Sequence, residues 1–268
     1  LLDENSLADI NLQFFLSTVC SFDVVIGDQD DYVWRDFTRV DTGPREWTAQ
    51  GDNPPVAYYM YYIYKYVSLV NQLRANRQQN TIPLRSYCPT TDNRPSQFIP
   101  HMNITEQIES LVCNMLLCQG GLLQGEPLWF TSSAVTYAYF LLQIPVVISP
   151  LSSVSLLKQI ASNRETTPPE GITRDITVSD KPSYRTNPFM DMLKLGIRVI
   201  LSSDSVLFNS SYTLEPIIEE YSVAASIYLL NTADLCEFVR NSVLCSGYEG
   251  WYKRHWLGIQ LEQTAYMR

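Results

Sequence analysis

Histidine, the commonest metal ligand and general base in proteins, is scarce in this 268-residue chain. There are two histidines, His101 and His255, whereas a catalytic zinc site takes about three protein ligands, commonly histidines. The six cysteines form no C-x-x-C pair, so the sequence signals neither a zinc ribbon nor a redox dithiol. The serines at 152, 153 and 155 lack the spacing of a nucleophile elbow. These residue types therefore predict neither a metal centre nor a nucleophilic triad.

Each remaining candidate has a simpler structural interpretation. We expect His101 to be exposed in a loop and His255 to pack or cap near the C-terminus. Cys88 is either a reactive thiol or a small apolar filler, and the filler is favoured because Arg85 is the one cation signalled beside it. The tyrosines between 58 and 66 are expected to pack in a core or interface rather than to stack on bases.

The elements that must position these residues follow an alternating pattern. Strands are expected at 22–27, 81–87, 145–148 and 198–201, with a weak strand or turn at 119–122. Helices are expected at 6–19, 54–77, 105–117, 131–142, 187–196, 214–230 and 234–244. Short apolar strands alternating with helices indicate βα units around a parallel sheet. About five such units are present, fewer than the eight of a closed barrel.

Local signals set two of the helix starts and the domain organisation. Asp52-Asn53-Pro54-Pro55 predicts an Asp or Asn cap with prolines in the first turn. Thr232 is predicted to cap the helix at 234–244. No internal repeat or linker is visible, so residues 1–268 are predicted to form a single domain.

Composition excludes several partner classes. Apolar residues make up 46% of the chain, enough for a sizeable core. The net charge of −9 argues against nucleic acid or an anionic membrane as the main partner, since both require a basic surface. The most apolar stretch, 137–148, is too short to span a bilayer. We expect no transmembrane segment and an intracellular location.

Segments spread over nearly the whole chain resemble those of AMP deaminases. They are Asp52–Tyr62 (D-N-P-P-x-A-Y-Y-x-Y-Y), Gln143–Ser152 (Q-I-x-x-x-x-S-P-L-S), Leu201–Asp204 (L-S-T-D), Glu215–Ser222 (E-P-L-x-E-E-Y-S), Arg240–Leu244 and His255–Gly258. The resemblance implies an α/β fold, the C-terminal portion of a TIM-type (β/α) barrel. It also implies a family chemistry in which zinc, held by histidines and an aspartate, activates water to attack the purine ring while a glutamate transfers protons.

The resemblance breaks down at the positions that carry this chemistry. The family's H-C-G-E falls on 87–90, so Tyr87 replaces a zinc histidine and Thr90 replaces the catalytic glutamate. Cys118–Gly121 is the counterpart of the family's S-H-G and has no histidine. Asp204 matches a zinc ligand, although alone it is better interpreted as a solvated or hydrogen-bonded carboxylate, and Ser205 replaces the second aspartate. The family's paired histidines lie upstream of the aligned region, so the barrel is expected to be incomplete at its N-terminal side.

The resemblance with these losses predicts a pseudoenzyme with no zinc cofactor. We expect a structural or accessory subunit of a larger protein assembly, with a mitochondrial location favoured over a cytosolic one. The alternative is a regulatory pseudoenzyme that still binds a purine nucleotide. A third hypothesis is an active deaminase, converting AMP to IMP, completed by an upstream segment or partner.

Two long loops are candidates for contact with other proteins. The insertion near 158–186 is polar and much longer than the family connection, and it contains Pro168, Pro169 and Arg174. The loop at 89–104 also appears expanded relative to the family. Both are expected on the catalytic face of the barrel, where they would meet protein partners.

Overall fold

The computed structural model describes residues 10–25, 42–47, 54–88, 104–118, 120–150, 187–203 and 214–258. These residues belong to two compact units, each of which is described by itself. Unit 1 takes its described residues from 1–87, 113–121 and 243–268, and unit 2 takes them from 88–112 and 122–242.

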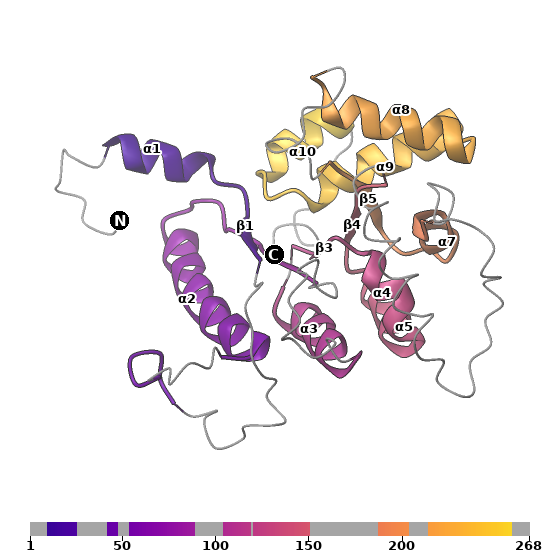
Figure 1. Ribbon diagram of the computed structural model, residues 1–268. Helices are drawn as coiled ribbons and strands as arrows, with labels where there is room; N and C mark the ends of the chain where they lie inside the picture. The colour runs from indigo at the N-terminus through magenta and orange to yellow at the C-terminus, as the bar shows by residue number, and fades with distance from the viewer. Residues whose placement is uncertain are drawn as a thin grey trace. The chain divides into compact units, whose positions relative to one another are not determined.

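Unit 1 is built around two parallel strands. Its elements are α1 (Ile10–Thr18), β1 (Phe22–Val24), α2 (Val56–Asn76), β2 (Leu84–Tyr87), the end of α3 (Ile104–Leu117) and α10 (Gly250–Leu257) (Figure 1). Phe22 lies opposite Leu84 in the parallel register of β1 and β2. The pair is tied by Arg85, whose Nε and Nη2 donate to the two carboxylate oxygens of Asp23 at 2.6 and 2.7 Å. The core of this unit contains Val24, Val56, Met60, Leu84 and Cys118.

Helix α2 begins later than the sequence predicts. Pro55 is the N-cap residue, with an extended backbone (φ −66°, ψ 159°), and its carbonyl accepts from the amides of Tyr58 and Tyr59. The prediction of prolines in the first turn is therefore wrong. A residue before proline is driven out of the helical region, so Pro54 cannot start the helix, which begins after the second proline. Asp52 and Asn53 lie outside the described residues.

Unit 2 holds three parallel strands with their helices. Its elements are β3 (Leu122–Leu123), α4 (Glu126–Thr131), α5 (Ser133–Leu142), β4 (Val146–Ile148), α7 (Phe189–Lys194), β5 (Val199–Leu201), α8 (Pro216–Tyr228) and most of α9 (Thr232–Cys245). Strand β4 pairs with β3 and with β5. Every residue of β4 and β5 is buried, as expected for strands covered on both faces.

Three local features of unit 2 differ from or complete the predictions. The helix expected at 131–142 is α5, which begins at Ser133 because the backbone of Ser132 is extended (φ −155°, ψ 126°), and the short helix α4 before it was not predicted. The cap of α9 is Asn231, not Thr232: the Asn231 and Asp234 side chains each accept from the other's backbone amide at 2.9 Å. Gly196, just after α7, has φ +86°, which confirms the predicted glycine stop.

The predicted fold class is confirmed. Each of the five strands is parallel to a neighbour and is followed along the chain by a helix, which makes five βα units of the kind that form TIM-type barrels. No helix among the described residues is both long enough and apolar enough to cross a membrane.

Candidate functional site

The carboxyl end of β2 is where the resemblance places a zinc histidine and a glutamate. Parallel βα folds place their functional side chains at this end of the strands. Tyr87, half-buried, is the last residue of β2, and Cys88 follows it with no exposed surface. Burial raises the pKa of the Cys88 thiol to about 12. This complete enclosure supports the interpretation of Cys88 as a small apolar filler.

A buried hydrogen-bond cluster occupies the region around Cys118, where the family has a histidine. The Nδ2 of Asn114 donates to Ser86 Oγ at 2.8 Å and to the Gly121 carbonyl at 3.0 Å. Burial raises the pKa of the Cys118 thiol to about 11, although hydrogen bonds with Ser86 and Asn114 lower it. These groups join the end of α3 to β2, so this position serves packing instead of proton transfer.

Gly120 shows how tightly the same turn lies against β2. Its amide donates to the carbonyl of Leu84 at 2.9 Å. A Cβ at Gly120 would lie 2.5 Å from Arg85 Cγ and 3.0 Å from the Leu84 carbonyl oxygen. No side chain fits there without displacing the strand, so the turn leaves no room for a substrate between Gly120 and β2.

In unit 2, a fully buried carboxylate follows the carboxyl end of β3. Glu126 has no exposed surface, and its Oε1 accepts from Asn187 Nδ2 at 3.3 Å. The Oδ1 of Asn187 in turn accepts from the amide of Phe189, the first residue of α7, at 3.0 Å. Glu126 is thus joined to the start of α7. The sequence analysis missed it, although a glutamate between Gly125 and Pro127 in an apolar stretch was a visible signal.

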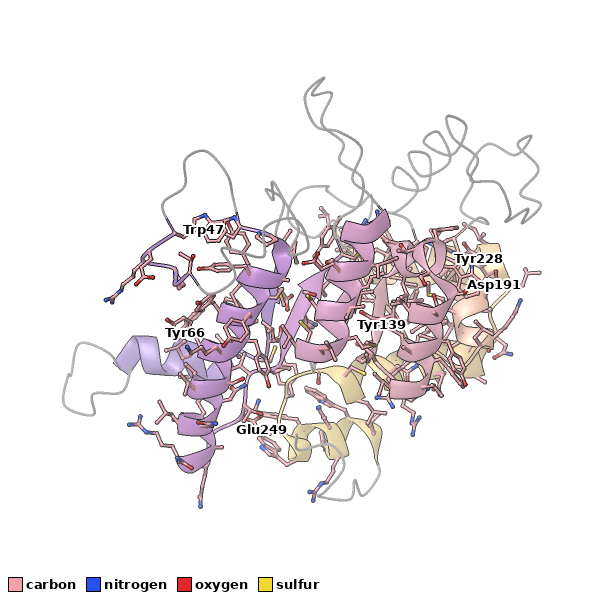
Figure 2. The ribbon with its side chains drawn as sticks, turned by 90° about the horizontal axis from the view of Figure 1, so that it is seen from below. Trp47, Tyr66, Tyr139, Asp191, Tyr228 and Glu249 are labelled. Carbon is pink, nitrogen blue, oxygen red and sulfur yellow. The ribbon has the colours of Figure 1, made fainter. Side chains whose placement is uncertain are left out.

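Tyr228 adjoins the same pair from the end of α8. The pKa of its phenol is raised to about 12, chiefly by burial and with a smaller contribution from the charges of Glu126 and Asp191, against a hydrogen bond with the Asn187 backbone that lowers it. Its ring meets Phe189 edge-on with centroids 4.4 Å apart. Figure 2 shows Tyr228 and Asp191 at the same end of the unit. Glu126, Asn187 and Tyr228 therefore bind α4, α7 and α8 together.

The remaining strand ends contribute short polar residues. Ser149 is buried after β4, and the Ser202 amide after β5 donates to the Ile148 carbonyl at 3.0 Å. The other residues that sequence reasoning singled out lie outside the described residues: Thr90, Pro168, Pro169, Arg174, Asp204 and Ser205.

The described residues do not fit a zinc ion. Within the seven described ranges, no three His, Cys, Asp or Glu side chains gather as metal ligands. His255 lies exposed in the last turn of α10. At the strand end that matches the family's zinc histidine, the groups present are the phenol of Tyr87 and the buried thiol of Cys88. We derive no reaction step through a metal.

Comparison with known proteins identifies relatives that match nearly the whole of this chain. A profile of the AMP deaminase family matches residues 3–179 and 179–266. Two inactive deaminases of Saccharomyces cerevisiae are 55% and 45% identical over 96% and 97% of this chain, which is 31% and 32% of their own lengths. An AMP deaminase of the same yeast is 37% identical over 98% of this chain and 27% of its own length. The chain thus spans about a third of the length of these relatives.

An adenine deaminase from Arthrobacter aurescens aligns over 79% of this chain and 51% of its own, with 15% identity and a TM-score of 0.47.

Proposed function

The chain belongs to the AMP deaminase family, and from this premise we propose that it is a catalytically inactive member that serves as a structural subunit of a larger protein assembly. Its similarity to two inactive deaminases supports the loss of catalysis. The assembly is our proposal for why the fold is retained without the chemistry.

One observation carries the proposal: the residues that flank the zinc-histidine position Tyr87 are enclosed by packing. Cys88 next to Tyr87 is fully buried, and Cys118 lies in the cluster with Ser86 and Asn114. Groups that act as a unit in catalysis lose most of their effect when one is removed, so these replacements account for an inactive site.

The first test is catalysis with metal supplied. The protein purified from its own cells is loaded with zinc and mixed with AMP, and released ammonia is measured beside the metal content. The AMP deaminase of Saccharomyces cerevisiae is the positive control. We expect no ammonia above the buffer blank and no stoichiometric zinc. Ammonia release together with one zinc per chain would support the active-deaminase hypothesis and end this proposal.

The second test is assembly. The tagged protein, expressed at its natural level, is purified under mild conditions and its mass is measured by gel filtration with light scattering. We expect co-purification of other subunits in fixed stoichiometry. Recovery as a free monomer only would contradict a structural subunit. Fractionation of the same cells tests the proposed mitochondrial location against the cytosol.

A regulatory nucleotide-binding role is the competing proposal, and it makes a different prediction. Titration calorimetry with AMP, ATP and GTP at millimolar concentration would give measurable heat if a purine pocket persists. We expect none, because the described groups around Tyr87 and Cys118 are committed to packing. Saturable heat with any of the three nucleotides would favour the regulatory role over the structural one.

A further inference from the structure

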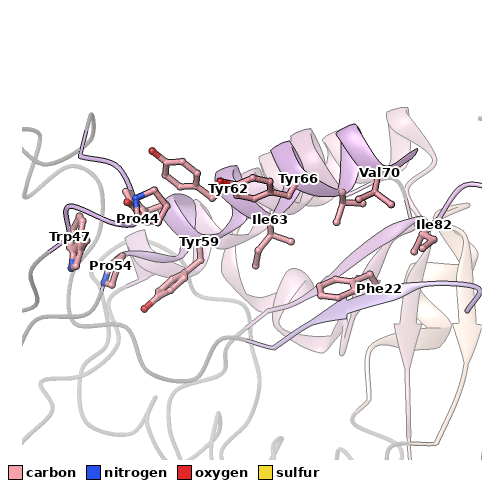
Figure 3. Close-up of a pocket in the computed structure, with 12 residues that line it drawn as sticks. Phe22, Pro44, Trp47, Pro54, Tyr59, Tyr62, Ile63, Tyr66, Val70 and Ile82 are labelled. Atoms are coloured by element: carbon pink, nitrogen blue, oxygen red, sulfur yellow. The ribbon is translucent and has the colours of Figure 1, made fainter. Parts of the chain in front are cut away.

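Unit 1 exposes apolar side chains at two places. One is a groove of about 720 Å³ beside α2, where Tyr62, Tyr66 and Val70 follow one another along an outer stripe of the helix (Figure 3). None of the residues that line this groove carries a charge, so the lining does not select one class of partner over another. The other place is α10 with the turn before it, where aromatic and basic side chains stand together.

Four aromatic side chains form one cluster on this segment, the α10 cluster: Tyr248, Trp251, Tyr252 and Trp256. The ring of Tyr252 stacks on that of Trp251 with centroids 3.5 Å apart and on that of Trp256 with centroids 5.6 Å apart. Tyr248 meets Trp256 edge-on at a centroid distance of 5.2 Å. Trp251 is nevertheless 60% exposed and Trp256 is 49% exposed. A contiguous exposed surface of this kind marks a site of contact.

Another side of α10 fixes this helix to the rest of unit 1. Lys253 is buried, and its Nζ donates to the Leu244 carbonyl near the end of α9 at 2.9 Å. In the turn before α10, the Gly247 carbonyl accepts from Asn80 Nδ2, and a Cβ on Gly247 would collide with the Cys20 carbonyl. The exposed rings are therefore presented by a helix that is already held in place, which lowers the entropy cost of binding a partner.

Arg254 carries a hydrogen-bond donor that lacks an acceptor. Its Nε is buried and has no partner among the described residues, whereas Arg85 Nε and Lys253 Nζ of the same unit each donate to an oxygen. An enclosed donor without an acceptor is unfavourable, and a carboxylate would accept from Nε and a terminal nitrogen of the guanidinium together. Arg254 is half-buried and follows Trp251 by three residues, so this donor lies beside the α10 cluster.

The residue types of this surface define what could occupy it. Trp, Tyr and Arg are the types that contribute most to binding in protein interfaces. His255, which is exposed, follows Trp251 by four residues and Tyr252 by three, so it adds a second polar group between these rings. An occupant would therefore place apolar side chains on the rings and carboxylates beside Arg254 and His255.

A single-stranded nucleic acid is a poorer fit to the same residues. Bases bind by stacking on open aromatic faces, but Tyr252 already stacks on Trp251 and Trp256. A phosphate backbone would also approach a chain of net charge −9 without the extended basic surface that it requires. An acidic peptide needs only the guanidinium of Arg254 for its carboxylate. The surface therefore favours a peptide.

We propose that the α10 cluster with Arg254 is a docking surface for a peptide segment of a partner protein in which apolar side chains stand next to carboxylates. The proposal rests on the structural role proposed above and deepens it, because it names a surface and the chemistry of the partner that would bind there. It adds this surface to the two long loops that the sequence predicts as protein contacts.

Peptide binding to the protein as encoded by its own gene tests the proposal. The probes are fluorescent synthetic peptides that combine Asp or Glu with Leu, Phe or Trp in varied order, each beside a counterpart with Asn or Gln in place of the acids. Binding is measured by fluorescence anisotropy for the unmodified protein and for Trp251→Ala and Arg254→Gln. Tyr61→Ala, at an exposed ring of α2, and Arg240→Gln, at an exposed arginine of α9, are the matched controls.

The expected result is binding that depends on both the ring and the guanidinium. At least one acidic peptide should bind saturably, and its Asn or Gln counterpart should bind about tenfold more weakly. Trp251→Ala and Arg254→Gln should each weaken binding of the acidic peptide by about tenfold, while the two controls stay within about twofold of the unmodified protein. Circular dichroism checks that each variant is folded. No saturable binding at millimolar peptide, or equal weakening in the variants and the controls, would overturn the proposal.

Two other outcomes would assign the surface to a different occupant and would also overturn the proposal. One is binding of a fluorescent oligothymidylate that Trp251→Ala abolishes, and the other is self-association in light scattering that Trp251→Ala removes, each without peptide binding. The test is separate from that of the structural role. Subunits that co-purify equally well with Trp251→Ala would refute this docking surface alone, and a free monomer that still binds the acidic peptide would refute the structural role alone.

Discussion

The two units use their apolar residues differently. In unit 2, all residues of β4 and β5 are buried, and the buried carboxylate of Glu126 after β3 accepts a hydrogen bond from Asn187 at the start of α7. In unit 1, two of the three residues of β1 are exposed and α2 presents an apolar stripe to a groove. Buried polar groups hold neighbouring elements together in both units, as Asn114 does in unit 1 and Glu126 does in unit 2. Among the described residues, unit 1 alone combines an unpaired strand edge with an apolar groove. Unit 2 therefore illustrates a fold that is kept for its packed interior, whereas unit 1 illustrates a fold that is kept for a surface that can make contacts.

The largest expected effect is in the interior of unit 2. Phe189 has no exposed surface and contacts the rings of Tyr228 and Phe238 at centroid distances of 4.4 and 5.9 Å. Phe189→Ala should lower the free energy of unfolding by about 3–5 kcal/mol, through lost burial and the cavity left behind. Urea unfolding followed by circular dichroism measures it. Leu142→Ala is the control at a side chain that is 60% exposed. Equal losses in the two variants would mean that Phe189 is packed no more tightly than an exposed side chain of the same unit.

A smaller effect is expected where Asn187 links Glu126 to α7. Asn187→Ala removes a hydrogen bond to the first amide of α7 and another to a buried carboxylate, so it should cost about 2–3 kcal/mol of unfolding free energy. Asn231→Ala removes an exposed cap of α9 and should cost about 1 kcal/mol. Unfolding of both variants under the same conditions gives the comparison. If Asn187→Ala costs no more than Asn231→Ala, the buried network adds nothing to unit 2.

The elements could be predicted because their signals are local. Apolar runs such as 145–148 and 198–201 predicted β4 and β5, and the glycine stop at Gly196 was read from sequence alone. The caps were missed for a different reason. Asn231 and Thr232 are adjacent, so which of them caps α9 depends on the residue at which the helical backbone begins. Pro55 restricts the backbone of Pro54, and α2 therefore begins only after the second proline. Strand β3 has two residues and is too short to show the alternation of apolar and polar residues that predicts a strand.

The site was predictable where it depended on residue identity and not where it depended on tertiary contact. Tyr87 was found because its position in a recognisable segment calls for a histidine. The pairing of Glu126 with Asn187 joins residues 61 positions apart, and nothing local to either announces it. The tyrosines of α2 were expected to pack in a core or an interface, and Tyr64 does pack against the core. That Tyr66 instead remains exposed depends on what lies beside α2, which no local pattern specifies.

Alkaline pH should test whether both units enclose their thiols. Burial raises the pKa of Cys88 in unit 2 to about 12 and that of Cys118 in unit 1 to about 11, from 9.0. The folded chain therefore keeps these protons where the unfolded chain loses them, so the stabilisation is present below about pH 9 and is lost as the pH rises towards 12. For Cys88, the loss between pH 8 and 10.5 is about 2 kcal/mol.

Variants separate this effect from general alkaline unfolding. Cys88→Ala should lose less unfolding free energy between pH 8 and 10.5 than the unmodified chain, while Cys236→Ala, which changes an exposed thiol, should match it. Urea titrations at both pH values give the two differences. An identical loss of unfolding free energy in Cys88→Ala and in the unmodified chain would show that Cys88 ionises as easily in the folded state as in the unfolded state. The end of β2 would then be open to solvent.

The smallest expected change in the free energy of unfolding is for Tyr66 on the outer side of α2 in unit 1. A small change there, beside the large one for Phe189, would distinguish the two units. Tyr66 is 58% exposed, so its ring buries little surface in the 268-residue chain. Tyr66→Ala should change the free energy of unfolding of that chain by about 0.5 kcal/mol, because exposed substitutions outside special contacts rarely do more. The same urea titration as for Phe189→Ala measures it, with Tyr61→Ala as the matched variant on the same helix. A loss of about 2 kcal/mol at Tyr66 would mean that the groove is already closed in this chain, since only a covered ring costs that much to remove.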